Sequence, residues 1–243
     1  TGDIWGYKLK RNPQGEVIID ATGLPARPSE IEYVACALPD WEGAFNTSVK
    51  YKNWSFAMQW DGKVGGKTYS QSHHKMSEQG HIKETLNGRK PGTSLYLDID
   101  NPDIQALFKA QKITPVAGVY CIAPGVVDNG DGTYSPNQKI VTIEAYYKEY
   151  YRIGNVETNT FDTSYLKLRE VRIDYNLPKK WLKNTFISNA TVGLYGRNLL
   201  CITDYPMYDP ETASLDGSSF VTGVEVGTLP TTRSYGINLK VDF

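Results

Sequence analysis

The chain has 243 residues, with 26 lysines and arginines against 27 aspartates and glutamates, a formal net charge of -1 and a mean hydropathy of -0.43. Charges so evenly balanced give no argument for a nucleic-acid partner, and the longest uncharged stretch, residues 113–127, is too short and too rich in Pro and Gly for a spanning helix. The polar average does not exclude a transmembrane β-barrel, because barrels keep polar residues in their lumen and loops.

The first residues and the cysteines bear on where the protein resides. The chain opens with Thr1-Gly2-Asp3-Ile4-Trp5, which is neither an initiator methionine nor a basic segment followed by an apolar one, so we expect a piece of a larger protein. Three cysteines allow at most one internal disulfide in an oxidising compartment. We favour three unpaired thiols, including Cys201, over a bridge between Cys36 and Cys121. No cluster of Cys and His predicts zinc.

The first predicted strands form a hairpin. Apolar and polar residues alternate over 44–51, and the same alternation returns over 54–61, after Lys52-Asn53. A period of two places alternate side chains on opposite faces of a strand, and two such runs joined by two residues predict a tight β-hairpin. We expect strands at about 43–52 and 54–70.

The same alternation predicts three further strands, at about 164–178, 189–203 and 232–243. The last of them has the length of about 9–11 residues that a tilted strand needs to cross a bilayer. In the strand at 164–178 the apolar parity switches from Leu166 and Leu168 to Val171 and Ile173, across Arg169-Glu170. This switch predicts either a β-bulge or the level at which the strand leaves a bilayer.

One parity of these strands contains no charged residue, whereas the other includes Lys50, Asp61, Arg172, Asp174 and Lys240. A Lys or Arg on a lipid-facing surface costs about 2–4 kcal/mol at the bilayer midplane, so the uncharged parity predicts the lipid face. Since lipid offers no water to the edges of a sheet, such strands must belong to a closed barrel. The predicted lipid-facing residues are Trp54, Phe56, Met58, Trp60, Val171, Ile173, Tyr235, Ile237, Leu239 and Val241, and the predicted C-terminal assembly signal is Tyr235 with Phe243.

The lengths of the connections predict the orientation of the strands. Those at 52–53 and 178–188 are short, and those at 1–42, 71–163 and 203–232 are long. Transmembrane barrels have short periplasmic turns and longer extracellular loops. Aromatic residues, which favour the headgroup boundary, flank the short connections at Tyr51, Trp54, Tyr175 and Trp181. The last strand is therefore expected to end at the periplasm.

Several motifs stand in the order found in one family. They are Pro39 to Thr47 with Tyr51 to Ser55, Gly65 to Ser70, Ser164 to Val171 with Tyr175 to Pro178, Gly196-Arg197-Asn198-Leu199, Tyr205 to Glu211, and Pro230 to Arg233. Together they resemble the C-terminal end of SusC/RagA-type TonB-linked outer-membrane transporters. The likeness is carried by the strands and their flanks. Residues 72–162 match only loosely, and there we expect the loops that determine substrate choice.

The resemblance implies an all-β fold in which residues 1–243 supply the last five antiparallel strands of a large transmembrane β-barrel with long extracellular loops. The plug domain would lie outside this chain. The implied location is the outer membrane of a Gram-negative bacterium, crossed by several strands. The implied function is active import of oligosaccharides or peptides, driven by TonB and assisted by a SusD-like surface lipoprotein that closes over the barrel as a lid.

The partners implied by the resemblance are the rest of the barrel and its plug, the SusD-like lipoprotein, TonB, a glycan or peptide substrate, and outer-membrane lipid. We expect no cofactor, no metal and no nucleic acid. The sequence carries no G-x-S-x-G elbow, H-E-x-x-H motif or Walker loop, so we also expect no enzyme.

Four tyrosines in the longest loop are the candidate site for ligand or lid contact. On a helix, an i,i+4 spacing places Tyr146 over Tyr150 and Tyr147 over Tyr151. Aromatic faces of this kind can stack on sugar rings. We favour packing in the core of the loop, or contact with the lid, over stacking on a sugar.

Two other loop motifs have plainer interpretations. For His73-His74 near Glu78 we favour a solvated loop over a metal site, because adjacent residues point apart in a strand and lie off one face of a helix. Residues 128–133 miss the spacing of a calcium-binding loop. A plain turn is the better interpretation of that run.

A secreted all-β glycan-binding or adhesin module is the alternative to the transporter. Such a module would bury one parity and expose the other to water, and it would need protection at both sheet edges. Here the uncharged parity continues to Phe243 with no charge on that face. We therefore favour the transporter.

Overall fold

The computed structural model describes residues 2–211, 214–216 and 219–243. The chain divides into two compact units. We call the first the sheet unit, which comprises Ala37–Lys67, Phe161–Thr212 and Thr228–Phe243. The second, the loop unit, comprises Thr1–Cys36, Thr68–Thr160 and Ala213–Gly227. The sequence predicted one barrel segment with attached loops, whereas the structure gives these loops a compact unit of their own.

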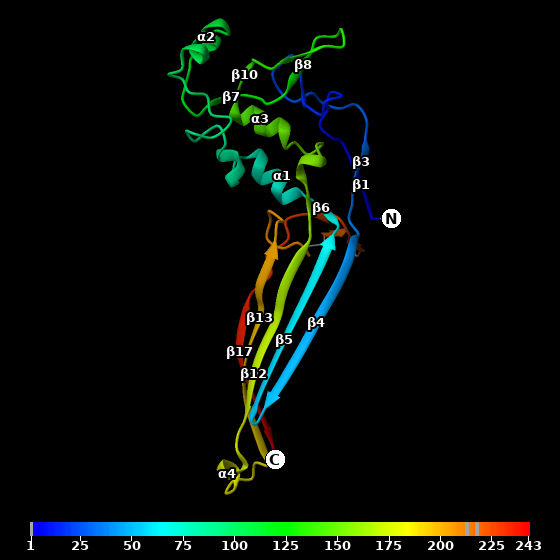
Figure 1. The fold of residues 1–243 in the computed structure, drawn as a ribbon, viewed down its shortest axis with the longest axis vertical. Coiled ribbons are helices and arrows are strands. Elements are labelled where there is room, and N and C mark those ends of the chain that lie inside the picture. The colour runs from blue at the N-terminus through cyan, green and yellow to red at the C-terminus, as the bar shows by residue number, and fades with distance from the viewer. Residues whose placement is uncertain (1, 212–213, 217–218) are drawn as a thin grey trace. The chain divides into compact units, whose positions relative to one another are not determined.

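The sheet unit is built on one antiparallel five-stranded sheet, with the strand order β17-β13-β12-β5-β4 (Figure 1). Its strands are β4 (Pro39–Tyr51), β5 (Trp54–Gly65), β12 (Tyr165–Asn176), β13 (Asn189–Thr203) and β17 (Ser234–Asp242). The all-β, antiparallel fold predicted from the sequence is confirmed, and within this chain the sheet is open rather than closed into a barrel.

Two segments of the chain contain features that the sequence did not predict. The expected strand at 54–70 is divided at Gly66, because β5 ends at Gly65 and β6 (Lys67–Ser70) begins beyond it. Both glycines have positive φ, of 78° and 77°, a conformation that glycine adopts without steric cost. A Cβ on Gly65 would lie 2.2 Å from Asp40 Oδ2. A short helix, α4 (Lys179–Leu182), occupies the connection at 178–188, for which the sequence predicted only a short length.

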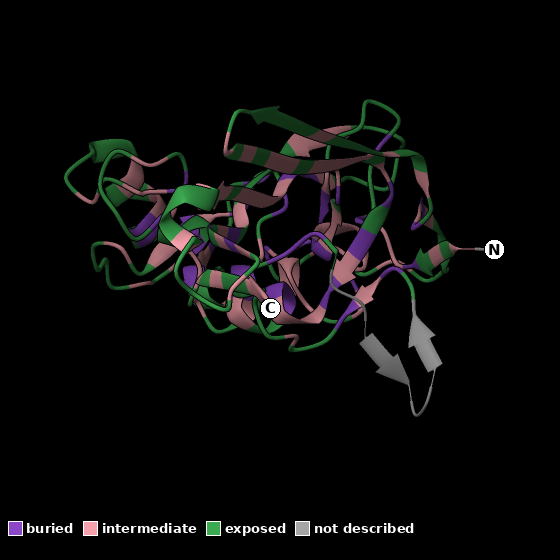
Figure 2. Cartoon of the chain, turned by 90° about the horizontal axis from the view of Figure 1, so that it is seen from below, coloured by how far each residue is buried: buried purple, intermediate pink, exposed green. Residues whose placement is uncertain are grey.

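The register across the sheet gathers the uncharged parity on one face. Phe56 lies opposite Ile173, Ile173 opposite Leu194, and Leu194 opposite Ile237. Many of these side chains are exposed, Ile237 to 75%. Figure 2 shows few buried residues along these strands. These exposed fractions leave apolar area on this face of the sheet accessible, and contact with lipid stays a prediction.

The loop unit combines short strands with helices. The helices are α1 (Gln71–Glu78), α2 (Pro102–Ala110) and α3 (Ile143–Tyr150), with 3-10 turns η1 (Lys83–Leu86) and η2 (Glu157–Asn159). The remaining strands of the chain are β1 (Asp3–Gly6), β2 (Ile18–Ile19), β3 (Glu32–Cys36), β7 (Tyr120–Ile122), β8 (Val126–Asp128), β9 (Tyr134–Pro136), β10 (Ile140–Thr142), β11 (Thr160–Asp162), β14 (Ser214–Asp216), β15 (Ser219–Val221) and β16 (Val224–Glu225).

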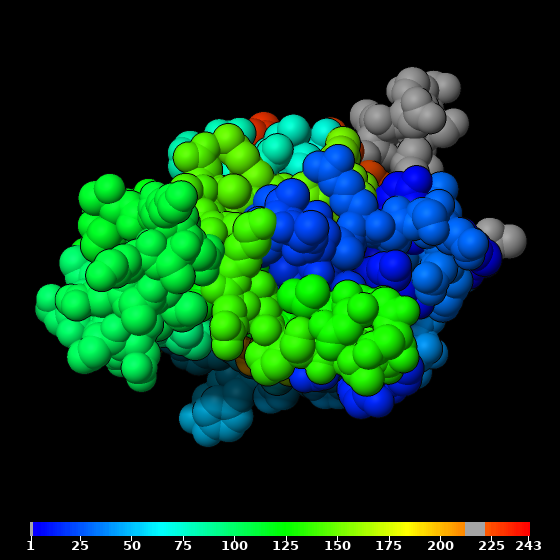
Figure 3. Space-filling model, turned by 90° about the horizontal axis from the view of Figure 1, so that it is seen from above, coloured from blue at the N-terminus to red at the C-terminus, as the bar shows by residue number. Residues whose placement is uncertain are grey.

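The early residues of the chain are part of this unit. β2 pairs in parallel with β8, which in turn pairs with β9, and Arg27 forms a bidentate ion pair with Glu149 at 2.7 and 2.8 Å. Residues near the start of the chain, in blue, accordingly lie against those around 120–150, in green, in Figure 3. Contacts between segments so distant in sequence make this unit more than a collection of separate loops.

Among the described residues, no helix has both the length and the apolar composition to cross a membrane.

The facing of β17 is testable by a pair of neighbouring substitutions in the full-length protein. Ile237 lies on the uncharged face, and Asn238 lies on the opposite face against Gly193. We expect Ile237→Arg to destabilise barrel assembly by about 2–4 kcal/mol if the position lies near the bilayer midplane, and Asn238→Arg to be tolerated. The measurement is heat-modifiable gel mobility of both variants. Equal effects of the two would show that the faces are wrongly assigned.

Candidate functional site: a charged junction at the bulge of β12

An extra residue in β12 displaces the register of the sheet. Between the pairs Leu168–Trp60 and Glu170–Gln59, β5 has no intervening residue and β12 has one, Arg169. The predicted bulge is therefore confirmed. Because a single extra residue reverses the parity of a strand, Leu168 and Val171 both lie on the uncharged face. The parity switch in the sequence thus keeps that face continuous.

The neighbouring strand β13 also has unpaired residues at the level of the bulge. Between Leu168–Leu200 and Glu170–Arg197, β13 has two intervening residues, Asn198 and Leu199. Two extra residues leave the parity of β13 unchanged. Asn198 has a φ of 52°, in the left-handed region that Asn tolerates better than most residues. The motif at 196–199 thus forms the bulged part of β13.

Two cations of β12 converge on three carboxylates beside the bulge. Arg169 binds Asp61 in a bidentate pair, at 2.6 and 2.7 Å, and also contacts Glu211. Lys167 donates to Asp209 at 2.7 Å and contacts Glu211. The side chains of Lys167 and Asp209 are only 5% and 2% exposed. A buried charge is tolerated when it is paired and hydrogen-bonded, and these contacts meet that condition.

Tyr165 completes the junction from the start of β12. Its hydroxyl donates to Glu211 Oε1 at 2.7 Å. The Lys167 ammonium lies 4.9 Å from the centre of its ring, within the range of a cation–π interaction. Tyr165 therefore contacts both the anionic and the cationic side of the cluster. We call Asp61, Tyr165, Lys167, Arg169, Asp209 and Glu211 the charged junction.

The charged junction fixes the two ends of the connection between β13 and β17. Asp209 and Glu211 lie after β13, and Thr231, just before β17, donates to Asp209 Oδ2 at 2.6 Å. Near the same end, Asn198 donates to the carbonyl of Thr232 at 3.1 Å. Both ends of this long connection are thereby attached to β12 and β13.

The carboxylates of this connection stay ionised well into acid. Burial alone raises the pKa of Glu211, but hydrogen bonds from Arg169, Lys167 and Tyr165 more than offset it and lower the pKa to about 2. The pKa of Asp209 is also lowered, because hydrogen bonds from Lys167 and Thr231 outweigh the effect of burial. The electrostatics of the junction are those of a permanent ion cluster, which suits attachment rather than proton transfer.

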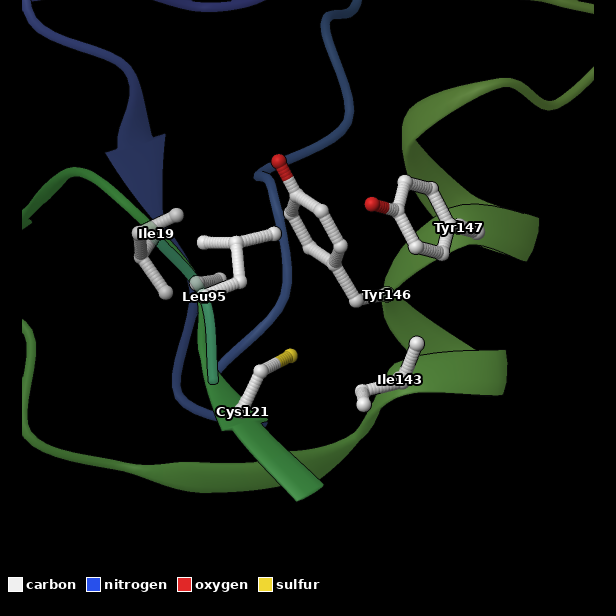
Figure 4. Packing of buried hydrophobic residues seen from close by; sticks show 7 residues of the cluster. Ile19, Leu95, Cys121, Ile143, Tyr146 and Tyr147 are labelled. Atoms are coloured by element: carbon white, nitrogen blue, oxygen red, sulfur yellow. The ribbon is translucent and has the colours of Figure 1, made fainter. Parts of the chain in front are cut away.

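Two of the four candidate tyrosines are buried in the loop unit. Tyr146 and Tyr147 are 7% and 5% exposed and belong to the core of the loop unit, with Ile19, Leu95 and Cys121 (Figure 4). The hydroxyl of Tyr147 donates to two carbonyls, at 2.9 and 3.0 Å. The i,i+4 pairing is correct, with the rings of Tyr147 and Tyr151 stacked 6.0 Å apart.

The reason for this position is the amphipathic character of α3. Helical spacing directs Ile143, Tyr146 and Tyr147 to one side, where they bury apolar area, and Tyr150 and Tyr151 pack against the same core. Two of the four rings are thus withdrawn from solvent. The structure supports the alternative of packing within the loop for Tyr146 and Tyr147, and ligand or lid contact by the group stays a prediction.

The prediction of a solvated loop at His73-His74 is wrong. Both residues are in α1 and are buried, to 3% and 1% exposure. His73 Nδ1 lies 3.1 Å from Asn159 Oδ1, and His74 Nε2 lies 3.3 Å from Glu78 Oε2. Burial lowers the pKa of both imidazoles, which favours their neutral forms. Over the described ranges, no group of His, Cys, Asp and Glu is arranged to hold a metal ion.

The remaining loop and cysteine predictions fit the structure. Residues 128–133 form the tight turn between β8 and β9, in which Asn129 donates its backbone N–H to the carbonyl of Thr133 at 3.1 Å. All three cysteines are free thiols, with Cys121 buried and Cys201 exposed.

Sequence reasoning found the bulge but missed the charged junction. The parity switch marked Arg169, yet nothing in β12 alone indicates that Asp209 and Glu211 would approach it. The available signal was the motif at 205–211, which places two carboxylates in a long connection near a strand with two cations. Which cations pair with these carboxylates follows only from the register of the strands.

The chain is similar in sequence to two curated receptors. No family model matches the chain. TonB-dependent receptor P3 from Formosa agariphila is 22% identical over 239 residues, which cover 96% of this chain and 19% of that receptor. TonB-dependent receptor P26 from the same organism is 33% identical over 85 residues, 34% of this chain and 9% of that receptor. The chain therefore spans a fifth or less of the length of these relatives.

Solved structures share the fold. A structure of the RagAB peptide importer in an open-open state matches 100% of this chain and 23% of its own chain, with a TM-score of 0.55 and 14% identity. A structure of the RagAB peptide transporter matches 99% of this chain and 22% of its own, with a TM-score of 0.56 and 15% identity. The resemblance to SusC/RagA-type TonB-linked transporters, predicted from the motifs, is confirmed by the two receptors in sequence and by RagAB in fold.

Removing the cation of the junction tests its contribution to stability. We expect Lys167→Met to destabilise the sheet unit by about 3–5 kcal/mol, because it removes the buried ammonium that pairs with the Asp209 carboxylate. The measurement is protease sensitivity of the connection between β13 and β17 in the detergent-purified full-length protein. Lys240→Met is the control, since Lys240 lies 3.8 Å from Asp242 at an exposed position. Similar sensitivity in both variants would contradict the assignment.

The low pKa of Glu211 predicts a pH dependence. A carboxyl group with a lowered pKa stabilises the folded state above its unfolded pKa of 4.5, and this stabilisation is lost as the pH falls through about 2. We expect the connection to resist pepsin near pH 4.5 and to become cleavable towards pH 2. Glu211→Gln should be cleavable at both values. A connection that is equally resistant in wild type and variant across this range would exclude the proposed role of Glu211.

Proposed function

We propose that this chain is part of a TonB-dependent active transporter in the outer membrane of a Gram-negative bacterium. The observation that carries the proposal is the two-faced sheet. One face is uncharged over all its strands and carries many exposed apolar side chains, and the other carries paired charges such as Arg197–Glu170 at 2.8 Å and Arg172–Asp174 at 2.7 Å. These are the properties of a barrel wall with lipid outside and an aqueous lumen inside.

The sequence relatives support the same function. They are named TonB-dependent receptors, and neither they nor the RagAB structures are described as enzymes. We propose that the rest of the barrel closes on the free edges of β4 and β17, since an open edge in lipid leaves backbone groups unsatisfied at several kcal/mol each. The plug and the segment that contacts TonB would come from the remainder of the protein.

We propose an oligosaccharide or a peptide as the substrate and a SusD-like surface lipoprotein as the partner. The RagAB structures describe a peptide importer, which supports the peptide, and the first receptor relative covers nearly the whole chain without specifying a substrate. We propose that the long segments 1–42, 71–163 and 203–232 are extracellular, and binding residues concentrate on such segments when a rigid scaffold holds them. Lid and substrate contacts are therefore proposed for the surface of the loop unit.

The function is tested with the full-length gene in its own host. We expect a deletion strain to lose growth on either an oligosaccharide mixture or a peptide mixture as the limiting nutrient, and to grow normally on monosaccharides and amino acids. The full-length protein should be recovered from the outer membrane only with detergent, together with a lipoprotein. Recovery in the medium without detergent would instead support the secreted adhesin. Unchanged growth on both mixtures would contradict import of either class.

A further inference from the structure

A small apolar groove lies on the uncharged face of the sheet. Its volume is about 200 Å³, and it is lined by Val171 and Ile173 from β12, Leu194, Tyr195, Gly196 and Leu199 from β13, and Tyr235 from β17. It is therefore formed by three neighbouring strands of the sheet unit and needs no residue from the loop unit. Leu194 and Tyr235 are 59% and 71% exposed, so the groove opens outward from the sheet.

The absence of a side chain at Gly196 creates the groove. A Cβ at this position would lie 2.7 Å from Leu199 Cδ2 and 3.3 Å from Tyr235 Cδ1. The first of these distances is too short for a van der Waals contact, so a larger residue would displace Leu199 and fill the space. Leu199 itself is one of the two extra residues of β13. The groove is thus a consequence of the bulge.

A cation stands at one end of the groove. Arg233 comes just before β17 and, by the alternation of that strand, falls on the same face as Tyr235. Its Nε donates to the carbonyl of Asn198 at 3.3 Å, and that carbonyl belongs to the peptide bond that leads to Leu199. Arg233 is exposed, and among the described residues no carboxylate forms an ion pair with its guanidinium. Its charge is available at the rim of the apolar lining.

The chemistry of the groove selects a lipid over a protein. A protein partner normally makes about one hydrogen bond for each 100–200 Å² of interface. The lining residues carry two polar side-chain atoms, the hydroxyls of Tyr195 and Tyr235. The Tyr195 hydroxyl lies on the opposite face of the sheet, where a Cβ on Gly236 would be 2.5 Å from it, so Tyr235 supplies the one hydroxyl on the groove's own face. An acyl chain requires apolar contact alone, and a guanidinium at the rim suits a phosphate. We propose that the groove binds one acyl chain of an anionic membrane lipid, whose phosphate group contacts Arg233. This proposal rests on the proposed membrane location of the sheet.

The test is native mass spectrometry of the full-length protein in detergent, with dioleoylphosphatidylglycerol or dioleoylphosphatidylcholine added. We expect the wild type to retain the anionic lipid about fivefold more tightly, since one Arg near an anionic headgroup contributes about that factor. Arg233→Gln should abolish this preference. Leu194→Trp, which fills the groove, should weaken retention of both lipids. Lys240→Gln, on the opposite face of β17, should behave as the wild type.

The outcomes separate this proposal from the proposed function. A wild-type protein that is soluble without detergent would overturn both. A correctly assembled, detergent-requiring protein that shows no preference for the anionic lipid would overturn the groove assignment alone. So would a variant Arg233→Gln that is indistinguishable from Lys240→Gln. Arg233 lies outside the strands and donates one hydrogen bond, to the Asn198 carbonyl, so we expect Arg233→Gln to assemble. This variant keeps the test informative if Leu194→Trp folds poorly.

Discussion

The extra residue of β12 is the constraint on which the sheet depends. If Arg169 were paired in a regular ladder, with no bulge, Leu166 and Leu168 would share a face with Arg172 instead of with Val171 and Ile173. The bulge instead lets one uncharged face run along the whole strand. Arg169 itself is directed to Asp61 and Glu211, so the residue that corrects the register also supplies a charge to the junction.

The same bulge connects four motifs that are far apart in sequence. The residues at 164–171 contribute the cations, those at 196–199 form the widened part of β13, those at 205–211 contribute carboxylates, and those at 230–233 attach through Thr231 and Thr232. Four motifs that are separate in the sequence thus form one structural feature. Its physical role is to hold a long connection against the strands from which it leaves and to which it returns.

Local alternation was sufficient to predict the strands and the hairpin at Lys52-Asn53, because a period of two is a property of each strand alone. It also located the parity switch at Arg169-Glu170, but it left a bulge and the edge of a bilayer as two possible causes. The charged junction needed the pairing of β5, β12 and β13, which no single segment specifies. The tyrosines of α3 show a different limit. Their i,i+4 spacing predicted the ring pairs, but whether a helix face meets a ligand or a core depends on Ile19, Leu95 and Cys121, which come from distant parts of the chain.

The same reasoning explains why the histidines were misplaced. An isolated His-His pair in a polar segment suggests solvent, whereas α1 packs against α3 and η2 and removes both imidazoles from water. Compactness of the loop unit was the property that sequence could not supply. It has a functional consequence, since a surface built on a packed core can present side chains to a lid or a substrate at fixed positions.

The most direct test of the account is the accessibility profile of β12 in a bilayer. Nitroxide labels placed one at a time from 166 to 173 in the full-length protein would report contact with molecular oxygen, which concentrates in lipid. The account predicts high accessibility at Leu166, Leu168, Val171 and Ile173 and low accessibility at Lys167, Glu170 and Arg172, with the phase of the alternation shifted at Arg169. An alternation that continues without a shift, or a profile with no alternation, would contradict it.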